Sequence, residues 1–349
     1  MNSKAFLLPA ALMIAGNSVA NSKGKKTDKR PNILVILADD LGYSDLGCYG
    51  RGIHTPNLDK LAQQGVRFNH FYNASRSCPT RASLLTGLYQ HQAGIGRMTF
   101  DDNLPGYRGT LSRNAVTIAE VLKESGYTTS MIGKWHVAET PLRKDQREWL
   151  AHHVYHDTYS DLCHYPVNRG FDSHYGTIYG VVDYFDPFSL VEGEVPVKEV
   201  PEGYYITQAL SDRAAEEVTE YAKDDKPFFM YLAYTAPHWP LHALPEDIEK
   251  YKDTYKVGWE AIRNARYERQ KQLGIFPGMD DFLSERQFKD RWEDNAHAEW
   301  DARAMAVHAA MIDRMDQGIG QVIDALEKTG QLDNTLILFL SDNGCSNEN

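Results

Sequence analysis

Four apolar runs recur along the chain, and polar residues follow each of them. The runs cover residues 32–38, 128–132, 227–234 and 335–340. The run at 32–38 is continuous, which is typical of a strand that is buried on both faces, as in a parallel sheet. The pattern therefore predicts an α/β fold with a largely parallel central sheet that is flanked by helices.

Segments with helical periodicity lie between these runs. Apolar side chains recur at helical spacing over residues 57–64, 116–124, 209–222 and 302–326. The last of these predicted helices leads into the last predicted strand. This alternation of strands and helices agrees with the predicted sheet.

Two long segments interrupt the alternation. Residues 141–204 are rich in Tyr, His and Pro, and we predict a long excursion over the sheet with a small hairpin near residues 191–200. Residues 241–297 are charged and aromatic. We expect them to form helical structure at the rim of a site.

Clusters of polar side chains come directly after the four predicted strands. They contain Asp39 and Asp40 after the first, Lys134 and His136 after the second, His238 after the third, and Asp342 and Asn343 after the last. Ligands of open α/β sheets bind outside the carboxyl ends of the strands. We therefore expect these residues to converge on one site, although they span most of the chain.

The stretch from Ser77 to Gly87 places a hydroxyl, a proline and an arginine at a predicted helix start. We place Pro79 at the opening of a short helix that ends at Gly87, with Ser77 at its cap. Arg81 follows Ser77 by about one turn and shares its face, and the first backbone N–H groups point the same way. This arrangement favours the binding of a tetrahedral oxyanion. On these residues alone, an ordinary capped helix with a surface arginine explains the stretch equally well.

Composition and charge narrow the classes of protein. A chain of 349 residues with 42% hydrophobic and 24% charged residues can form one large α/β domain. Its formal charge of −11 argues against a nucleic-acid partner. An anionic substrate would need local positive groups and a metal. The four cysteines, Cys48, Cys78, Cys163 and Cys345, form no CxxC pair and no zinc spacing.

The N-terminus has the features of a cleavable secretory signal. Lys4 precedes an apolar stretch at 5–16, and small residues follow before a polar segment. The stretch is shorter than the roughly 20 residues that span a membrane. We expect a signal peptide at 1–20, a linker at 21–30 and a catalytic domain at 31–349. The protein would be periplasmic or secreted, without a membrane anchor.

Taken together, these motifs resemble the formylglycine-dependent sulfatases of the alkaline phosphatase superfamily, and more narrowly the bacterial arylsulfatases, from about Pro31 onward. The family pentad is Cys or Ser, any residue, Pro, a small residue and Arg, followed by Leu-Thr-Gly. Aligned on Pro79 and Arg81, Ser77 and not Cys78 is the position converted to formylglycine. The resemblance implies a serine-type enzyme that hydrolyses sulfate monoesters after a dedicated maturase has oxidised residue 77 to an aldehyde.

The resemblance also implies a metal site. One Ca²⁺ would be held by oxygen atoms of Asp39, Asp40, Ser77, Asp342 and Asn343. An all-oxygen shell suits Ca²⁺ or Mg²⁺ and does not suit zinc. The hydrated aldehyde would offer two hydroxyls, of which one attacks sulfur and the other later expels sulfate.

Four further residues take catalytic roles by the same mapping. Arg81 would support the aldehyde hydrate and the metal site, and Lys134 would contact sulfate and the nucleophile. His136 would act as the base that regenerates the aldehyde, and His238 would bind sulfate or protonate the leaving oxygen. Trp239 and His242 are additional candidates for a substrate pocket.

Other interpretations remain open from the residues. The acidic clusters also fit loops or turns, and the histidines also fit structural positions. A phosphoesterase of the same superfamily would share the sheet, but such enzymes usually use two zinc ions, and Asn343 with the intact pentad favours a sulfatase. A non-catalytic protein that binds sulfated glycans is the third hypothesis. Because members of the family continue into a small antiparallel subdomain that supplies another active-site lysine, we expect that a chain ending at Asn349 is C-terminally incomplete.

Overall fold

The computed structural model describes residues 30–50, 52–139, 158–277, 283 and 291–346. The predicted signal peptide at 1–20 and nearly all of the predicted linker lie outside these residues. In the part of the chain that is described, no helix is long and apolar enough to cross a membrane.

Seven strands in the described residues form one sheet, in the order β5-β4-β3-β2-β6-β1-β7. The strands are β1 (Asn32–Ala38), β2 (Thr128–Gly133), β3 (Ser173–Thr177), β4 (Leu190–Glu192), β5 (Val195–Pro196), β6 (Phe228–Ala233) and β7 (Thr335–Ser341). Strands β3, β2, β6, β1 and β7 pair in parallel. Strand β4 pairs antiparallel with β3 and forms a hairpin with β5. The predicted α/β fold with a largely parallel sheet is confirmed.

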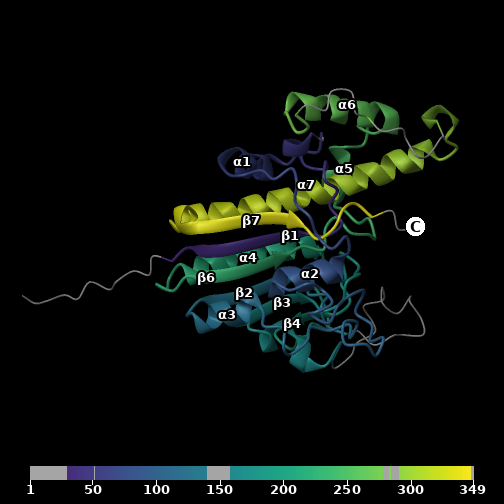
Figure 1. The fold of residues 1–349 in the computed structure, drawn as a ribbon. Coiled ribbons are helices and arrows are strands. Elements are labelled where there is room, and N and C mark those ends of the chain that lie inside the picture. Colours follow the sequence, from purple (N-terminus) through teal and green to yellow (C-terminus); the bar gives the residue numbers. More distant parts are fainter. Residues whose placement is uncertain (1–29, 51, 140–157, 278–282, 284–290, 347–349) are drawn as a thin grey trace, which may run out of the picture.

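Helices cover both faces of the sheet (Figure 1). They are α1 (Pro56–Gln64), α2 (Ser77–Thr86), α3 (Ile118–Glu124), α4 (Ile206–Tyr221), α5 (Pro245–Glu249), α6 (Trp259–Gln272) and α7 (Ala298–Lys328). Short 3₁₀ turns occur at Gly47–Tyr49, Leu162–His164, Pro166–Asn168, Trp292–Asp294 and Leu332–Asn334. The four helices predicted from periodicity correspond to α1, α3, α4 and α7.

The alternation of β1 side chains divides the core into two layers. Leu34 and Ile36 belong to the cluster that α4 and α7 cover, whereas Val35 and Leu37 belong to the cluster under α2 and α3. Successive side chains of a strand point to opposite faces, so β1, which is covered on both faces, favours apolar residues at successive positions. This preference explains the unbroken apolar run.

Strand β3 was not predicted, because it has no apolar run. It lies inside the excursion at 141–204 and reads Ser-His-Tyr-Gly-Thr. A Cβ at Gly176 would lie 2.0 Å from the carbonyl oxygen of Gly133 in β2, so the strand depends on a close approach of two backbones. The hairpin predicted near 191–200 is present as β4 and β5.

The start of α2 differs from the sequence-based expectation. The helix begins at Ser77 with Arg76 as its N-cap, and no side chain caps it. Placing Ser77 at the cap, and Pro79 at the helix opening, was therefore wrong. The Ser77 hydroxyl instead accepts a hydrogen bond from Arg81. Pro79 is tolerated because N–H groups of a first turn have no partner inside the helix. The helix ends before Gly87 (φ 68°), as predicted.

Candidate active site

The predicted site residues meet at the carboxyl end of the parallel strands. Asp39 and Asp40 follow β1, Lys134 and His136 follow β2, His238 follows β6, Asp342 and Asn343 follow β7, and Ser77 and Arg81 lie at the start of α2. Each of them is joined to another member of the set by a hydrogen bond or an ion pair. The structure therefore brings all nine together, while their chemical roles stay predictions.

Arg81 is the centre of this network and is fully buried. Its Nε atom donates to Ser77 Oγ over 2.9 Å, and its Nη2 atom donates to Asp342 Oδ2 over 2.8 Å. Its Nη1 atom donates to the Lys134 carbonyl over 2.9 Å. Burial alone would lower the pKa of Arg81, but the charge of Asp342 raises it. The guanidinium is thus a fixed positive group directly beside residue 77.

Three carboxylates lie close together in this interior. One oxygen from each of Asp39, Asp40 and Asp342 lies within 4.8 Å of the others, and all three residues are buried. Asp342 Oδ1 accepts the backbone N–H of Asp40 over 3.2 Å, and the carboxamide of Asn343 donates to Asp40. Lys134 Nζ forms an ion pair with Asp39.

The two central carboxylates respond differently to their surroundings. Burial raises the pKa of Asp39 well above its usual value, although Lys134 opposes the change. Burial also acts on Asp342, but the charges of Arg81 and Lys134 outweigh it and hold the pKa of Asp342 below its usual value. Asp342 is therefore ionised, whereas Asp39 needs more positive charge nearby than the protein itself supplies.

The residues fit a hard divalent cation. Asp39 Oδ1 is buried and has no hydrogen-bond partner among the described residues, although Arg81 Nη2 lies 3.4 Å away. A buried carboxylate oxygen without such a partner is costly unless an ion compensates for it. Carboxylate and carboxamide oxygens are the ligands that Ca²⁺ and Mg²⁺ prefer.

His136 faces the side chain of residue 77. Its Nδ1 atom lies 3.3 Å from Ser77 Oγ, and its Nε2 atom lies 3.2 Å from Cys78 Sγ. Burial, followed by the charge of Lys134, lowers the pKa of His136 well below its usual value. The imidazole is consequently neutral and able to accept a proton. Burial raises the pKa of Cys78 to about 12, so the thiol stays protonated.

His238 occupies the other side of the carboxylate cluster. Its Nδ1 atom lies 2.6 Å from the Trp239 carbonyl oxygen, and its Nε2 atom lies 3.6 Å from Asp40 Oδ2. A carbonyl only accepts hydrogen bonds, so Nδ1 carries a proton. Nε2 is therefore the nitrogen that is directed towards the carboxylates.

Gly180 belongs to the site but was missed from the sequence. A Cβ at this position would lie 2.3 Å from both Cε1 and Nε2 of His136. Such a contact is far shorter than van der Waals packing permits, so the absent side chain makes room for the imidazole. Gly180 follows β3, which the apolar pattern did not reveal, and no local motif marks it.

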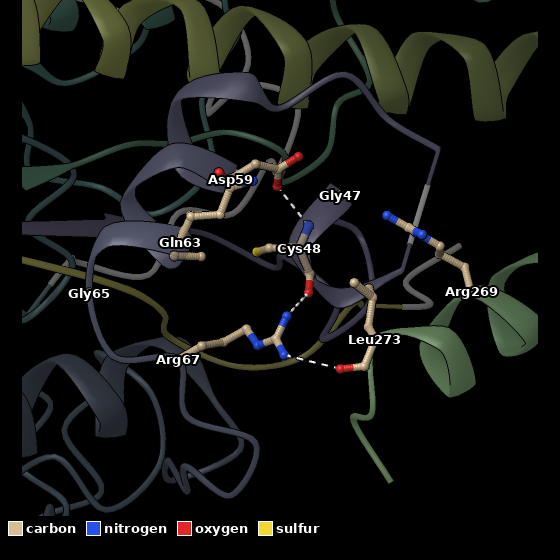
Figure 2. Close-up of a pocket in the computed structure, with 9 residues that line it drawn as sticks. Gly47, Cys48, Asp59, Gln63, Gly65, Arg67, Arg269 and Leu273 are labelled. Carbon is tan, nitrogen blue, oxygen red and sulfur yellow. Dashed lines mark hydrogen bonds between the residues drawn. The ribbon is translucent and has the colours of Figure 1, made fainter.

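A separate pocket of about 410 Å³ lies between the 3₁₀ turn at 47–49, α1 and α6 (Figure 2). None of the predicted site residues lines it. Asp59 Oδ1 accepts the Cys48 N–H over 2.6 Å, and Arg67 donates to the carbonyl oxygens of Cys48 and Leu273. These hydrogen bonds hold the walls of the pocket together.

Comparisons with known proteins agree with the motifs. A family model described as "Sulfatase" matches residues 31–349. The arylsulfatase of Klebsiella aerogenes is 34% identical over 353 residues, which cover 99% of this chain and 72% of that protein. An uncharacterised sulfatase of Schizosaccharomyces pombe is 35% identical over 342 residues, which cover 90% of this chain and 58% of that protein.

A solved structure shows the same fold. The crystal structure of Ps i-CgsB in complex with k-i-k-neocarrahexaose superposes with a TM-score of 0.62 and 33% sequence identity, over 90% of this chain and 59% of that one. The chain thus spans less than two thirds of the length of this protein and of the yeast relative.

Proposed function

The chain belongs to the sulfatase family, and from this premise we propose that it hydrolyses sulfate monoesters of aryl or carbohydrate alcohols to the alcohol and inorganic sulfate. The observation that carries the proposal is the buried guanidinium of Arg81, which contacts both Ser77 and Asp342. This contact joins the first residue of the pentad to the carboxylate cluster. The similarity to an arylsulfatase and to a protein crystallised with a neocarrahexaose supports the two substrate classes.

Ser77 is the proposed site of formylglycine, produced by a formylglycine-generating maturase. Support comes from its place in the pentad and from its two neighbours, Arg81 Nε at 2.9 Å and His136 Nδ1 at 3.3 Å. A hydrated aldehyde at this position supplies one hydroxyl that attacks sulfur and a second that allows the sulfate to be released. An unmodified serine lacks the second hydroxyl.

Asp39, Asp40, Asp342 and Asn343, with an oxygen of residue 77, are the proposed ligands of one Ca²⁺, with Mg²⁺ as the alternative. Three carboxylates together with Arg81 and Lys134 sum to one negative charge. A bound divalent cation makes this sum positive and supplies the attraction that an anionic ester needs in an acidic protein. The orphaned Asp39 Oδ1 supports this assignment.

The remaining residues orient the reacting groups and transfer protons. Arg81 fixes the side chain of residue 77, and Lys134, held by Asp39, directs its charge to the sulfate. Neutral His136 takes a proton at Nδ1 from the hydroxyl of residue 77 when the aldehyde is regenerated. In its doubly protonated form, with Nδ1–H held by the Trp239 carbonyl, His238 gives the Nε2 proton to the leaving oxygen.

Export to the periplasm or the medium is a further part of the proposal. It rests on the sequence of residues 1–20 alone, which lie outside the described residues. Comparing the N-terminal sequence of the protein from culture medium, periplasm and cytoplasm would test it.

Mass spectrometry of the Ser77 peptide, combined with turnover, tests the proposed activity. We expect protein produced together with a maturase to lose one pair of hydrogen atoms at Ser77 and to hydrolyse p-nitrophenyl sulfate. The Ser77→Ala variant should be inactive with an unchanged melting temperature. Faster hydrolysis of p-nitrophenyl phosphate than of the sulfate would contradict the proposal in favour of a phosphoesterase. Modified protein that binds sulfated sugars without turnover would contradict it in favour of a binding protein.

A further inference from the structure

Two segments that follow the strands on either side of β2 are hydrogen-bonded to each other beside the site. Residues 180–186 follow β3, and residues 235–242 follow β6. The buried Tyr184 hydroxyl lies 2.7 Å from the carbonyl oxygen of Thr235 and 2.8 Å from that of His238. Because the first segment also contacts the His136 ring at Gly180, both segments are held directly against the proposed catalytic residues.

These segments present large apolar side chains outside the catalytic centre. Trp239 is 37% exposed, and Phe185 and Leu241 are each 39% exposed. The Trp239 ring lies 5.7 Å from that of His238, at an angle of 31°. Aromatic rings that are exposed beside a catalytic group provide a flat apolar surface for a ligand ring.

A polar pair accompanies this apolar surface. His242 Nδ1 lies 3.6 Å from Asp183 Oδ2, and each side chain is about one third exposed. The His242 ring lies 5.6 Å from the ring of Phe185. A half-exposed carboxylate and imidazole next to an aromatic face can hydrogen-bond hydroxyl groups, which a simple aryl ring does not offer.

Charge restricts the ligand further. Residues 180–186 and 235–242 contain two aspartates and no lysine or arginine. A second anionic group on the substrate would be repelled there, whereas a neutral ring with hydroxyls would not.

We propose that Trp239, Phe185, Asp183 and His242 form the subsite for the leaving group, and that this leaving group is a neutral sugar that bears a single sulfate. The inference rests on the proposed sulfate ester hydrolysis and specifies its substrate class. The sugar ring stacks on the apolar surface, and its hydroxyls hydrogen-bond the Asp183–His242 pair.

Substrate discrimination by variants tests the subsite. The substrates are p-nitrophenyl sulfate and a panel of galactose and N-acetylglucosamine monosulfates. Asp183→Asn keeps the Oδ1 atom that accepts the N–H groups of Phe185 and Asp186. It should lower kcat/KM for the best sugar sulfate about tenfold more than for the aryl sulfate, mainly through KM, because about 1.4 kcal/mol of binding is lost. Trp239→Ala should also raise the sugar KM at least tenfold.

The matched control is Trp300→Ala, which removes a 74% exposed tryptophan of α7. It should leave both activities unchanged. Equal losses on sugar and aryl sulfates in Asp183→Asn, or a wild-type enzyme that hydrolyses the aryl sulfate but no sugar sulfate of the panel, would overturn the inference.

A binding measurement separates this inference from the proposed activity. Unmatured protein with Ser77 intact should bind the best sugar monosulfate in isothermal titration calorimetry, and Trp239→Ala should weaken that binding at least tenfold. Binding without any turnover after maturation would support the subsite and contradict the hydrolysis. Hydrolysis of the aryl sulfate, together with sugar binding that Trp239→Ala does not weaken, would support the proposed hydrolysis and contradict the subsite.

Discussion

Single side chains in the site are held by contacts that tolerate little change. His136 adopts a left-handed backbone conformation (φ 54°), as does Asp40 (φ 61°), and both lie in the loops just after parallel strands. Such conformations are costly for residues other than glycine and persist where the surroundings enforce them. The His136 ring contacts Ser77 and Cys78 on one edge, and Gly180 leaves the space beside it. Cys78, which resembles an alternative nucleophile in the sequence, is a neighbour of His136 instead.

A methyl group at Gly180 is predicted to displace His136. Gly180→Ala should lower kcat for an aryl sulfate roughly 10²-fold with little change in KM, because a catalytic group moved by about 1 Å loses that much rate. Steady-state kinetics and thermal unfolding check the prediction. Gly52→Ala is the matched control, because a Cβ there meets nothing within 4 Å. A Gly180→Ala enzyme with wild-type kcat would show that the imidazole position is not critical.

At the scale of elements, the helices are tied to one another by buried polar side chains as well as by apolar packing. Asp316 of α7 accepts the backbone N–H groups of Asn57 and Leu58 in the first turn of α1, over 3.1 and 2.8 Å. Thr55, the N-cap residue, makes no capping hydrogen bond. A side chain from another helix thus satisfies donors that a helix start leaves open.

Replacing Asp316 should separate stability from activity. Asp316→Ala is expected to lower the free energy of unfolding by about 3 kcal/mol, because two backbone N–H groups, of which that of Leu58 is buried, lose a carboxylate acceptor. Denaturant unfolding measures the change. The control Asp324→Ala removes an exposed aspartate of the same helix and should stay within about 0.5 kcal/mol of the wild type. Equal stability of the two variants would rule out this role for Asp316.

At the scale of the whole molecule, the site depends on the pairing of distant strands. β1 and β7 are neighbours, with Ala38 opposite Ser341. This register places Asp39 and Asp342 side by side just beyond the strands, although the two residues lie near opposite ends of the sequence. Arg81 and Lys134, from two further segments, compensate for part of the negative charge that the pairing assembles.

Calcium should therefore stabilise the whole fold. We expect EDTA to lower the melting temperature and added Ca²⁺ to restore it, with a gain of about 2.7 kcal/mol at a concentration one hundred times Kd. Asp40→Asn should reduce this gain, since it removes the charge of one of the proposed ligands. Differential scanning calorimetry with and without metal is the measurement. The same melting temperature in EDTA and in Ca²⁺, or a gain with Zn²⁺ alone, would contradict the assigned ion.

The sequence by itself determined the layout of the fold and predicted the residues that the structure brings together in the candidate site. Strands buried on both faces favour apolar residues throughout, so β1 and β6 were visible as apolar runs, and long amphipathic helices were visible by their period. Strand β7 was visible by the same pattern, although Leu336 and Leu338 are exposed, and β2 was visible as a short run that contains buried Thr and Ser. Polar residues at the ends of those runs, together with the pentad, identified the nine residues that the structure brings together. These signals are local in the chain, because they depend only on spacing within one segment.

Only the tertiary structure decided how those residues meet. Strand β3 packs closely on β2 because Gly176 has no side chain that would meet the Gly133 carbonyl, and Gly180 matters because of a ring that is forty-four positions earlier in the chain. The pKa values of Asp39 and Asp342 depend on their burial and on the charges of Arg81 and Lys134, which the fold places beside both carboxylates. Such contacts are set by distances between segments that are remote in sequence, and no periodicity or short motif encodes those distances.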